Sequence, residues 1–188
     1  MLDHDALHQR GMALEDEFFH RVDDQLVKDL RQSMEREAKR QQLATTTGFQ
    51  DHVLLDHLLD AGFDPTTITA LVLVPLVFVA WADDEITPLE RQSILSAAIH
   101  RGLKNHPLAF TKLDNWLYDR PPQALWNLWK EYVAAISTTL APTIAEMLRN
   151  EMLRLAKSVA EISRGKQAVA KVSKAEQDVL DELSRLSR

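Results

Sequence analysis

Residues 5 to about 42 form a stretch without proline in which apolar side chains recur mostly at every fourth position. The repeating positions are Leu7, Leu14, Phe18, Val22, Leu26, Leu30 and Met34. This spacing predicts one long α-helix with an apolar stripe. At 1.5 Å per residue the helix is about 55 Å long, more than the width of a domain of this size. Two interpretations stay open: part of the helix projects or packs on a partner, or it lies along its own bundle.

The rest of the chain also favours helices. The 5 glycines and 7 prolines among 188 residues are too few for an all-β protein with many tight turns. Helices are expected over about 51–61, 66–82, 88–101, 107–118, 122–138, 142–163 and 173–187. The block 66–82 is too long for a strand and contains Pro75, so a buried helix that is bent or shifted at that proline is expected.

This pattern predicts an all-α fold, a helical bundle of about seven to eight helices. Residues 1–45 are expected to form a long amphipathic arm and residues 46–188 the helical domain. In the expected helix 122–138, Trp126, Trp129 and Tyr132 recur at intervals of three and share one face. Such a face either lines a groove for a partner or belongs to the core, and the core is the favoured interpretation.

Charge and hydropathy limit the partners. The net charge is -6 with a pI of about 5.6, and the sequence shows no basic patch of the kind that binds nucleic acid. The most apolar run, 68–82, is shorter than the ~20 residues that span a bilayer, so no membrane insertion is expected. The first ten residues lack the pattern of a signal peptide, and a cytoplasmic location is expected. Cysteine is absent, which excludes disulfides and thiolate zinc sites.

Catalytic motifs are not found in the sequence. Neither G-x-S-x-G, H-E-x-x-H, a P-loop nor G-x-G-x-x-G occurs. His4 and His8 share a helix face, as do His52 and His57 more loosely, but neither pair has an evident third ligand. We therefore expect surface or partly buried histidines and a protein that is not an enzyme.

Two helix starts use the same sequence device. In "ITPLERQSIL", the spacing of Thr87 and Glu90 predicts a capping box with Pro88 in the first helical position. In "VSKAEQDVL", Ser173 and Glu176 repeat this spacing 86 residues later. The repetition suggests two structurally related halves.

The first of these starts follows an acidic loop, Asp83, Asp84 and Glu85. Carboxylates on a loop are hard oxygen ligands that suit Ca²⁺ or Mg²⁺. The spacing does not fit an EF-hand loop, and the helix dipole alone explains acidic residues beside a helix N-terminus. A cation site and a simple helix start are therefore both open.

The stretch "LVPLVFVAWADDEITPLERQSILSAA" resembles the pattern of the tellurite-resistance TerB-like family. In that family an apolar helix runs into A-x-A-D-G-x-[IV]-[ST]-x-x-E and then a second helix. The matching residues are Ala80, Ala82, Asp83, Ile86, Thr87 and Glu90, with Val172, Ser173 and Glu176 at the second start. The resemblance covers roughly residues 50–187.

The resemblance implies an all-helical, non-catalytic module with a stress-response or regulatory role. It implies a divalent cation, Ca²⁺ or Mg²⁺, held by Asp83, Glu90 and Glu176, with Asp84 and Glu85 as local additions. The chain departs from the family where Asp84 replaces a glycine, a residue that supplies φ > 0, and again at Ala170. The alternative is a metal-free scaffold that uses its N-terminal helix to dimerise or dock on a protein partner.

A second similarity lies within the N-terminal helix. The spacing R-x-x-A-x-E-x-x-F in "RGMALEDEFFHRVDDQL" is similar to the start of the bacterial ATP-synthase zeta inhibitor. It covers fewer than twenty residues, and amphipathic helices produce such matches easily, so it adds little to the expected function.

Overall fold

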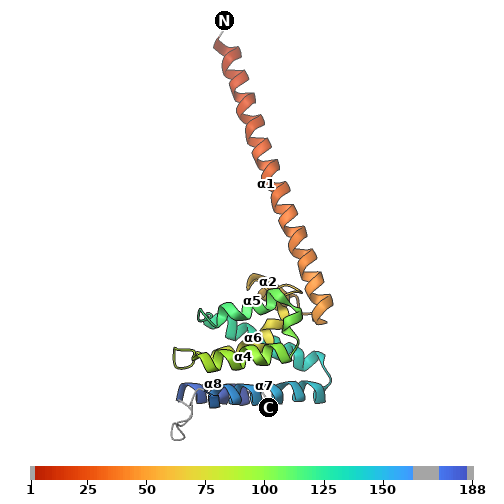
Figure 1. The fold of residues 1–188 in the computed structure, drawn as a ribbon. Coiled ribbons are helices and arrows are strands. Elements are labelled where there is room, and N and C mark those ends of the chain that lie inside the picture. Colours follow the sequence, from red (N-terminus) through yellow and green to blue (C-terminus); the bar gives the residue numbers. More distant parts are fainter. Residues whose placement is uncertain (1–2, 163–173, 186–188) are drawn as a thin grey trace. The chain divides into compact units, whose positions relative to one another are not determined.

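The computed structural model describes residues 3–162 and 174–185, with side chains from His20 onward. These residues form eight α-helices, two short 3-10 helices and no strand (Figure 1). The elements are α1 (Asp3–Thr47), α2 (His52–Asp60), η1 (Ile68–Leu73), α3 (Val74–Ala80), α4 (Pro88–His100), η2 (Leu103–Asn105), α5 (Pro107–Trp116), α6 (Gln123–Thr139), α7 (Pro142–Ile162) and α8 (Lys174–Arg185). The predicted all-α fold and long N-terminal helix are confirmed.

The chain divides into two compact units, Met1–Gln41 and Gln42–Arg188. The first unit consists of most of α1, and the second contains its last turns and all the other helices. α1 extends beyond the predicted end near residue 42, because the backbone N–H of Gly48 still bonds to the carbonyl of Ala44. Gly48 then takes φ 76°, the left-handed conformation that commonly ends a helix.

Helix α3 is the centre of the second unit. Six of its seven residues are buried, and it packs against η1, α4, α6, α7 and α8. Pro75 lies in the first turn of α3, where a missing N–H costs no hydrogen bond. The expected helix over 66–82, bent or shifted at Pro75, is therefore corrected in its bounds and type: a 3-10 helix over Ile68–Leu73 is followed by a separate α-helix, which begins where the proline is tolerated.

The predicted aromatic face of α6 lies in the core. The rings of Trp126 and Trp129 stack at a centroid distance of 5.0 Å, and Phe78 of α3 lies 5.1 Å from Trp126. Tyr132 meets Phe49 edge-to-face at 5.5 Å, and burial raises the pKa of the Tyr132 hydroxyl to about 12. The core interpretation of these aromatic residues is confirmed.

Helices α4, α7 and α8 run alongside one another on one side of the bundle (Figure 1). Helix α7 packs on both α4 and α8, and Lys130 of α6 bonds to Glu182 of α8 at 3.1 Å. Ser173, the expected N-cap of the last helix, lies outside the described residues. Within the described ranges no helix is both long and apolar enough to cross a membrane.

Candidate functional site

The predicted acidic residues lie in the connection between α3 and α4. Asp83, Asp84 and Glu85 are all exposed there. The loop is held at its start by Trp81, whose indole N–H donates to the carbonyl of Trp116 at 2.7 Å. Arg120 forms an ion pair with Asp84. The loop thus presents carboxylates to solvent from a fixed backbone.

Glu90 has the structural role that its spacing predicts. The Glu90 carboxylate accepts hydrogen bonds from the backbone N–H and the hydroxyl of Thr87, both at 2.7 Å. The Thr87 hydroxyl in turn accepts from the Glu90 N–H at 3.3 Å, which completes the capping box. Only 1% of Glu90 is exposed. One carboxylate oxygen of Glu90 is therefore occupied by the helix start.

Asp84 is the only described non-glycine residue with positive φ, at 68°. This is the position where the TerB-like pattern has glycine, and the backbone there does take the left-handed conformation. Aspartate adopts this conformation more readily than most residues because its short side chain can hydrogen-bond locally. The departure from the pattern thus leaves the turn intact.

Comparing Asp84→Gly with Asp84→Ala isolates the backbone effect, since both remove the same carboxylate. We expect the glycine variant to be the more stable of the two, with a free energy of unfolding about 1–2 kcal/mol higher than that of the alanine variant. The reason is that a Cβ is unfavourable at this positive φ. Glu85, whose φ is not positive, is the matched control: there alanine should be at least as stable as glycine. Equal stability of the two Asp84 variants in urea denaturation would contradict a strained turn.

Glu176 occupies the third position of α8, the same place that Glu90 has in α4. It is 3% exposed, so both predicted helix starts bury a glutamate. An acidic side chain in the first turn of a helix is stabilised by the helix dipole. The two starts are alike in this respect, whereas the relation between the two halves stays a prediction.

The five predicted ligands do not form a cluster that resembles a cation site. Among residues 20–162 and 174–185, no three Asp, Glu or His side chains are grouped so that they could hold a metal ion. Asp83, Asp84 and Glu85 are exposed, whereas Glu90 and Glu176 are buried in separate helix starts. Cation binding at these residues stays a prediction of the resemblance.

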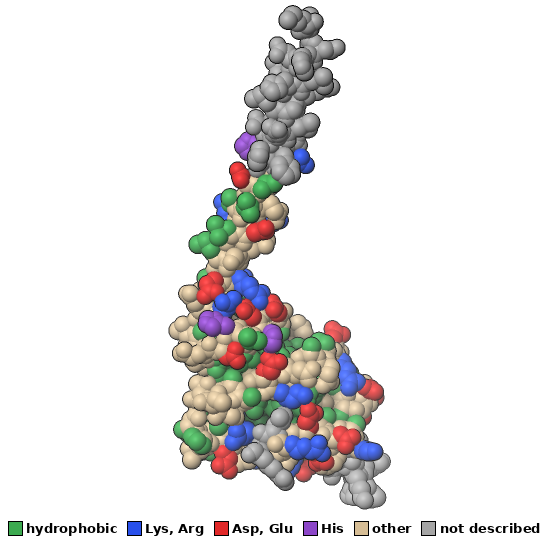
Figure 2. Space-filling model, turned by 180° about the vertical axis from the view of Figure 1, so that it is seen from behind, with side chains coloured by type: hydrophobic (Ala, Val, Ile, Leu, Met, Phe, Trp, Pro, Cys, Tyr) green, Lys and Arg blue, Asp and Glu red, His purple; other side chains and the backbone are tan. Residues whose placement is uncertain are grey.

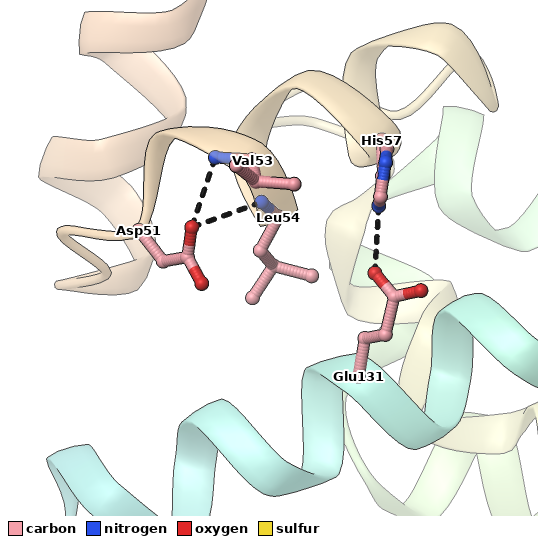
Figure 3. Close-up of polar contacts among 5 residues, drawn as sticks. All are labelled: Asp51, Val53, Leu54, His57 and Glu131. Atoms are coloured by element: carbon pink, nitrogen blue, oxygen red, sulfur yellow. Dashed lines mark hydrogen bonds and ion pairs between the residues drawn. The ribbon is translucent and has the colours of Figure 1, made fainter.

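A cleft between α2, α5 and α6 brings together charged side chains that the sequence analysis did not connect. Its volume is about 480 Å³, with Trp116, Leu125 and Leu128 among its apolar lining residues. At its rim, Nδ1 of His57 lies 2.7 Å from a carboxylate oxygen of Glu131 (Figure 3). These two residues are 74 positions apart, so no local motif signals the pair.

Lys112 in the cleft and Asp51 outside it support the two ends of α2. Lys112 donates to the carbonyl of Gly62, just beyond α2, at 2.9 Å, and burial lowers its pKa although Asp64 opposes the shift. The first turn of α2 is capped by Asp51, which accepts from the N–H groups of Val53 and Leu54 (Figure 3). The Lys112 bond therefore connects α5 to the end of α2, and the contact of His57 with Glu131 connects α2 to α6.

The hydrogen bond to Glu131 raises the pKa of His57 above its ordinary value, with further support from Asp60 and Asp51. Protonated His57 is therefore favoured in the folded protein. Its contribution to stability is present below the unfolded pKa of about 6.5 and is lost as pH rises through the folded pKa. In an NMR titration we expect Glu131→Gln to lower the pKa of the His57 ring. An unchanged pKa would contradict this pairing.

Helix α1 carries several exposed apolar side chains among its described residues. Val22, Leu26, Val27, Leu30 and Met34 are between 37% and 64% exposed. Four of these residues, Val22, Leu26, Leu30 and Met34, are spaced by four positions. At 100° per residue they cover an arc of about 120° of the helix surface. Figure 2 shows hydrophobic side chains on the surface of this part of the helix. Contiguous exposed apolar side chains commonly mark an interaction surface.

The fold defines the described chain as an all-α helical bundle with a long N-terminal helix. Comparisons with protein-family models, with curated proteins and with solved structures find no match. The TerB-like resemblance therefore rests on the sequence motif alone.

Proposed function

We propose that this chain is a non-catalytic interaction module with a TerB-like bundle, and that it self-associates through the apolar face of α1. The observation that supports this proposal is the exposure of Val22, Leu26, Val27, Leu30 and Met34. A long helix derives most of its stability from packing an apolar face, and α1 exposes its apolar side chains at these five positions. A second copy of α1 offers a face of the same length and character, and two-fold pairing uses the same patch on both chains.

A non-catalytic role agrees with the chemistry of the cleft. His57 is hydrogen-bonded to Glu131, and the Lys112 ammonium is bonded to a backbone carbonyl. We therefore interpret these polar contacts as supports of the fold.

The resemblance also implies a divalent cation at the acidic helix starts. The side-chain positions support this cation less well than they support an interaction module. Because Glu90 and Glu176 are buried in separate helix starts, we expect millimolar Ca²⁺ or Mg²⁺ to leave the melting temperature unchanged. A rise that is abolished by Asp83→Ala would establish a cation site and contradict this expectation.

Self-association is tested by the substitution Leu30→Glu in the full chain. In a dimer of this variant, each chain places a carboxylate where a leucine side chain was buried. Each lost leucine removes about 1.5–3 kcal/mol of the free energy that apolar burial contributes to association. We expect the dissociation constant of the dimer to rise about 100-fold or more, measured by sedimentation equilibrium. Gln32→Glu adds the same charge on the opposite face of α1 and should leave the dissociation constant within about threefold. A monomeric parent chain at 100 µM, about the level for weak association, would contradict the proposal.

A further inference from the structure

The charges of α1 are segregated along its length. By sequence, positions 3–24 carry seven acidic and two basic residues, a net charge of -5. Positions 25–41 carry five basic and three acidic residues, a net charge of +2. A helix with an acidic first half and a basic second half is attracted to a reversed copy of itself and repelled by a copy in the same direction.

The exposed apolar positions have a matching symmetry. Val22, Leu26, Leu30 and Met34 are arranged evenly about position 28. When the helix is reversed about this position, residue 22 becomes level with residue 34, and residue 26 with residue 30. These four positions are thus superposed on one another, which an isologous two-fold contact requires, whereas Val27 becomes level with Asp29.

This register also places opposite charges at the same level along the pair. Asp16 becomes level with Arg40, and each of these positions lies about 60° from the middle of the apolar stripe at 100° per residue. In a parallel pair in register, each of these side chains is level with its own copy instead. Charges that flank an apolar helix seam select orientation in this way.

From these two observations we propose that two chains associate through an antiparallel pairing of α1 centred at residue 28. The proposal rests on the self-association proposed above and specifies its geometry. The pairing extends over residues 15–41 of each chain, about 40 Å at 1.5 Å per residue. The C-terminal ends of the two paired segments, where each chain continues into its bundle, then lie at opposite ends of the pair.

The absence of cysteine from the sequence makes a disulfide test direct. Two full-length variants, Val22→Cys and Met34→Cys, are mixed in equal amounts, with a mass tag on one, and oxidised mildly. In the antiparallel pair the two different cysteines are level, whereas identical ones are about 18 Å apart along the axis, too far to bond. We expect the mixed disulfide to exceed both identical-chain disulfides by about tenfold or more, well above the twofold expected by chance.

The matched control uses Asp24→Cys and Gln32→Cys, which are also level in this register but lie on the polar face of α1. This mixture should yield little disulfide of any kind. Efficient mixed disulfide here would overturn the assignment of the interacting face.

The outcomes separate the two proposals. Dominant 22–22 and 34–34 disulfides in a dimeric protein would overturn the antiparallel orientation and leave self-association standing. A monomeric chain that forms no disulfide would overturn both. Salt provides a second readout: raising NaCl from about 0.05 to 0.5 M should weaken an antiparallel dimer, because it screens attraction between opposite halves. Strengthening by salt would indicate parallel pairing and overturn the proposal.

Discussion

Replacing Trp126 with alanine is expected to lower the free energy of unfolding of the bundle by about 3–5 kcal/mol. Trp126 is 2% exposed, stacks on Trp129, and contacts Phe78 of the central helix α3. Its removal leaves a cavity where α3 and α6 meet, and surrounding side chains fill such cavities only in part. For a unit of this size the melting temperature should fall by about 10 °C or more.

The control for this substitution is Tyr118→Ala. Tyr118 is an exposed aromatic residue whose ring lies 3.6 Å below the Arg91 guanidinium, so its loss should cost about 1 kcal/mol or less. Trp126→Phe retains an aromatic ring and should be intermediate. Urea denaturation monitored by circular dichroism gives all three values. Similar losses for Trp126→Ala and Tyr118→Ala would contradict the position of Trp126 in the core.

Glu90→Ala is expected to lower the free energy of unfolding by about 2–3 kcal/mol, less than Trp126→Ala. The substitution removes the carboxylate that accepts from the Thr87 N–H and hydroxyl, and it leaves these two donors without this acceptor at a partly buried helix start. Loss of a cap costs about 1 kcal/mol, and a buried donor left without an acceptor costs about 1–3 kcal/mol. The helix affected is α4, which packs on α3 and α7.

Glu90→Gln tests whether hydrogen bonding explains this cost. The glutamine side-chain oxygen can still accept from Thr87, so the loss should be smaller, about 1 kcal/mol. Thr87→Ala combined with Glu90→Ala should show a coupling energy of about 0.5–3 kcal/mol, since the two side chains form one unit. Additive losses would show that Glu90 stabilises the bundle independently of the capping box. Glu85→Ala, on the exposed loop, should have little effect.

Local features of the fold follow from the sequence because their physical causes are local. The apolar period and the near absence of glycine and proline predict α1, and Gly48 ends it with positive φ. The capping box at Thr87 and Glu90 is predictable because both partners lie within one turn of helix. Whether residues 66–82 form one helix or two is not predictable in this way. The apolar pattern does not distinguish a single helix from a 3-10 helix that is followed by an α-helix with Pro75 in its first turn.

The candidate site illustrates the opposite case. The motif singles out Asp83, Asp84, Glu85, Glu90 and Glu176, but a spacing of 86 residues between the two helix starts contains no information on their distance. The described structure buries Glu90 and Glu176 and leaves the loop carboxylates exposed. The pairing of His57 with Glu131 has no sequence signal either, since each residue lies on a different helix and neither belongs to a motif.

The sequence by itself thus determined the all-α class, the helix starts and the apolar face of α1, because periodicity, capping and charge act within a few residues of one another. Only the tertiary structure decided which charged side chains meet and which apolar side chains are covered. Contacts such as His57 with Glu131, and Trp81 with the carbonyl of Trp116, depend on how the helices pack. Packing joins residues far apart in the chain, and a single sequence carries no measure of those distances.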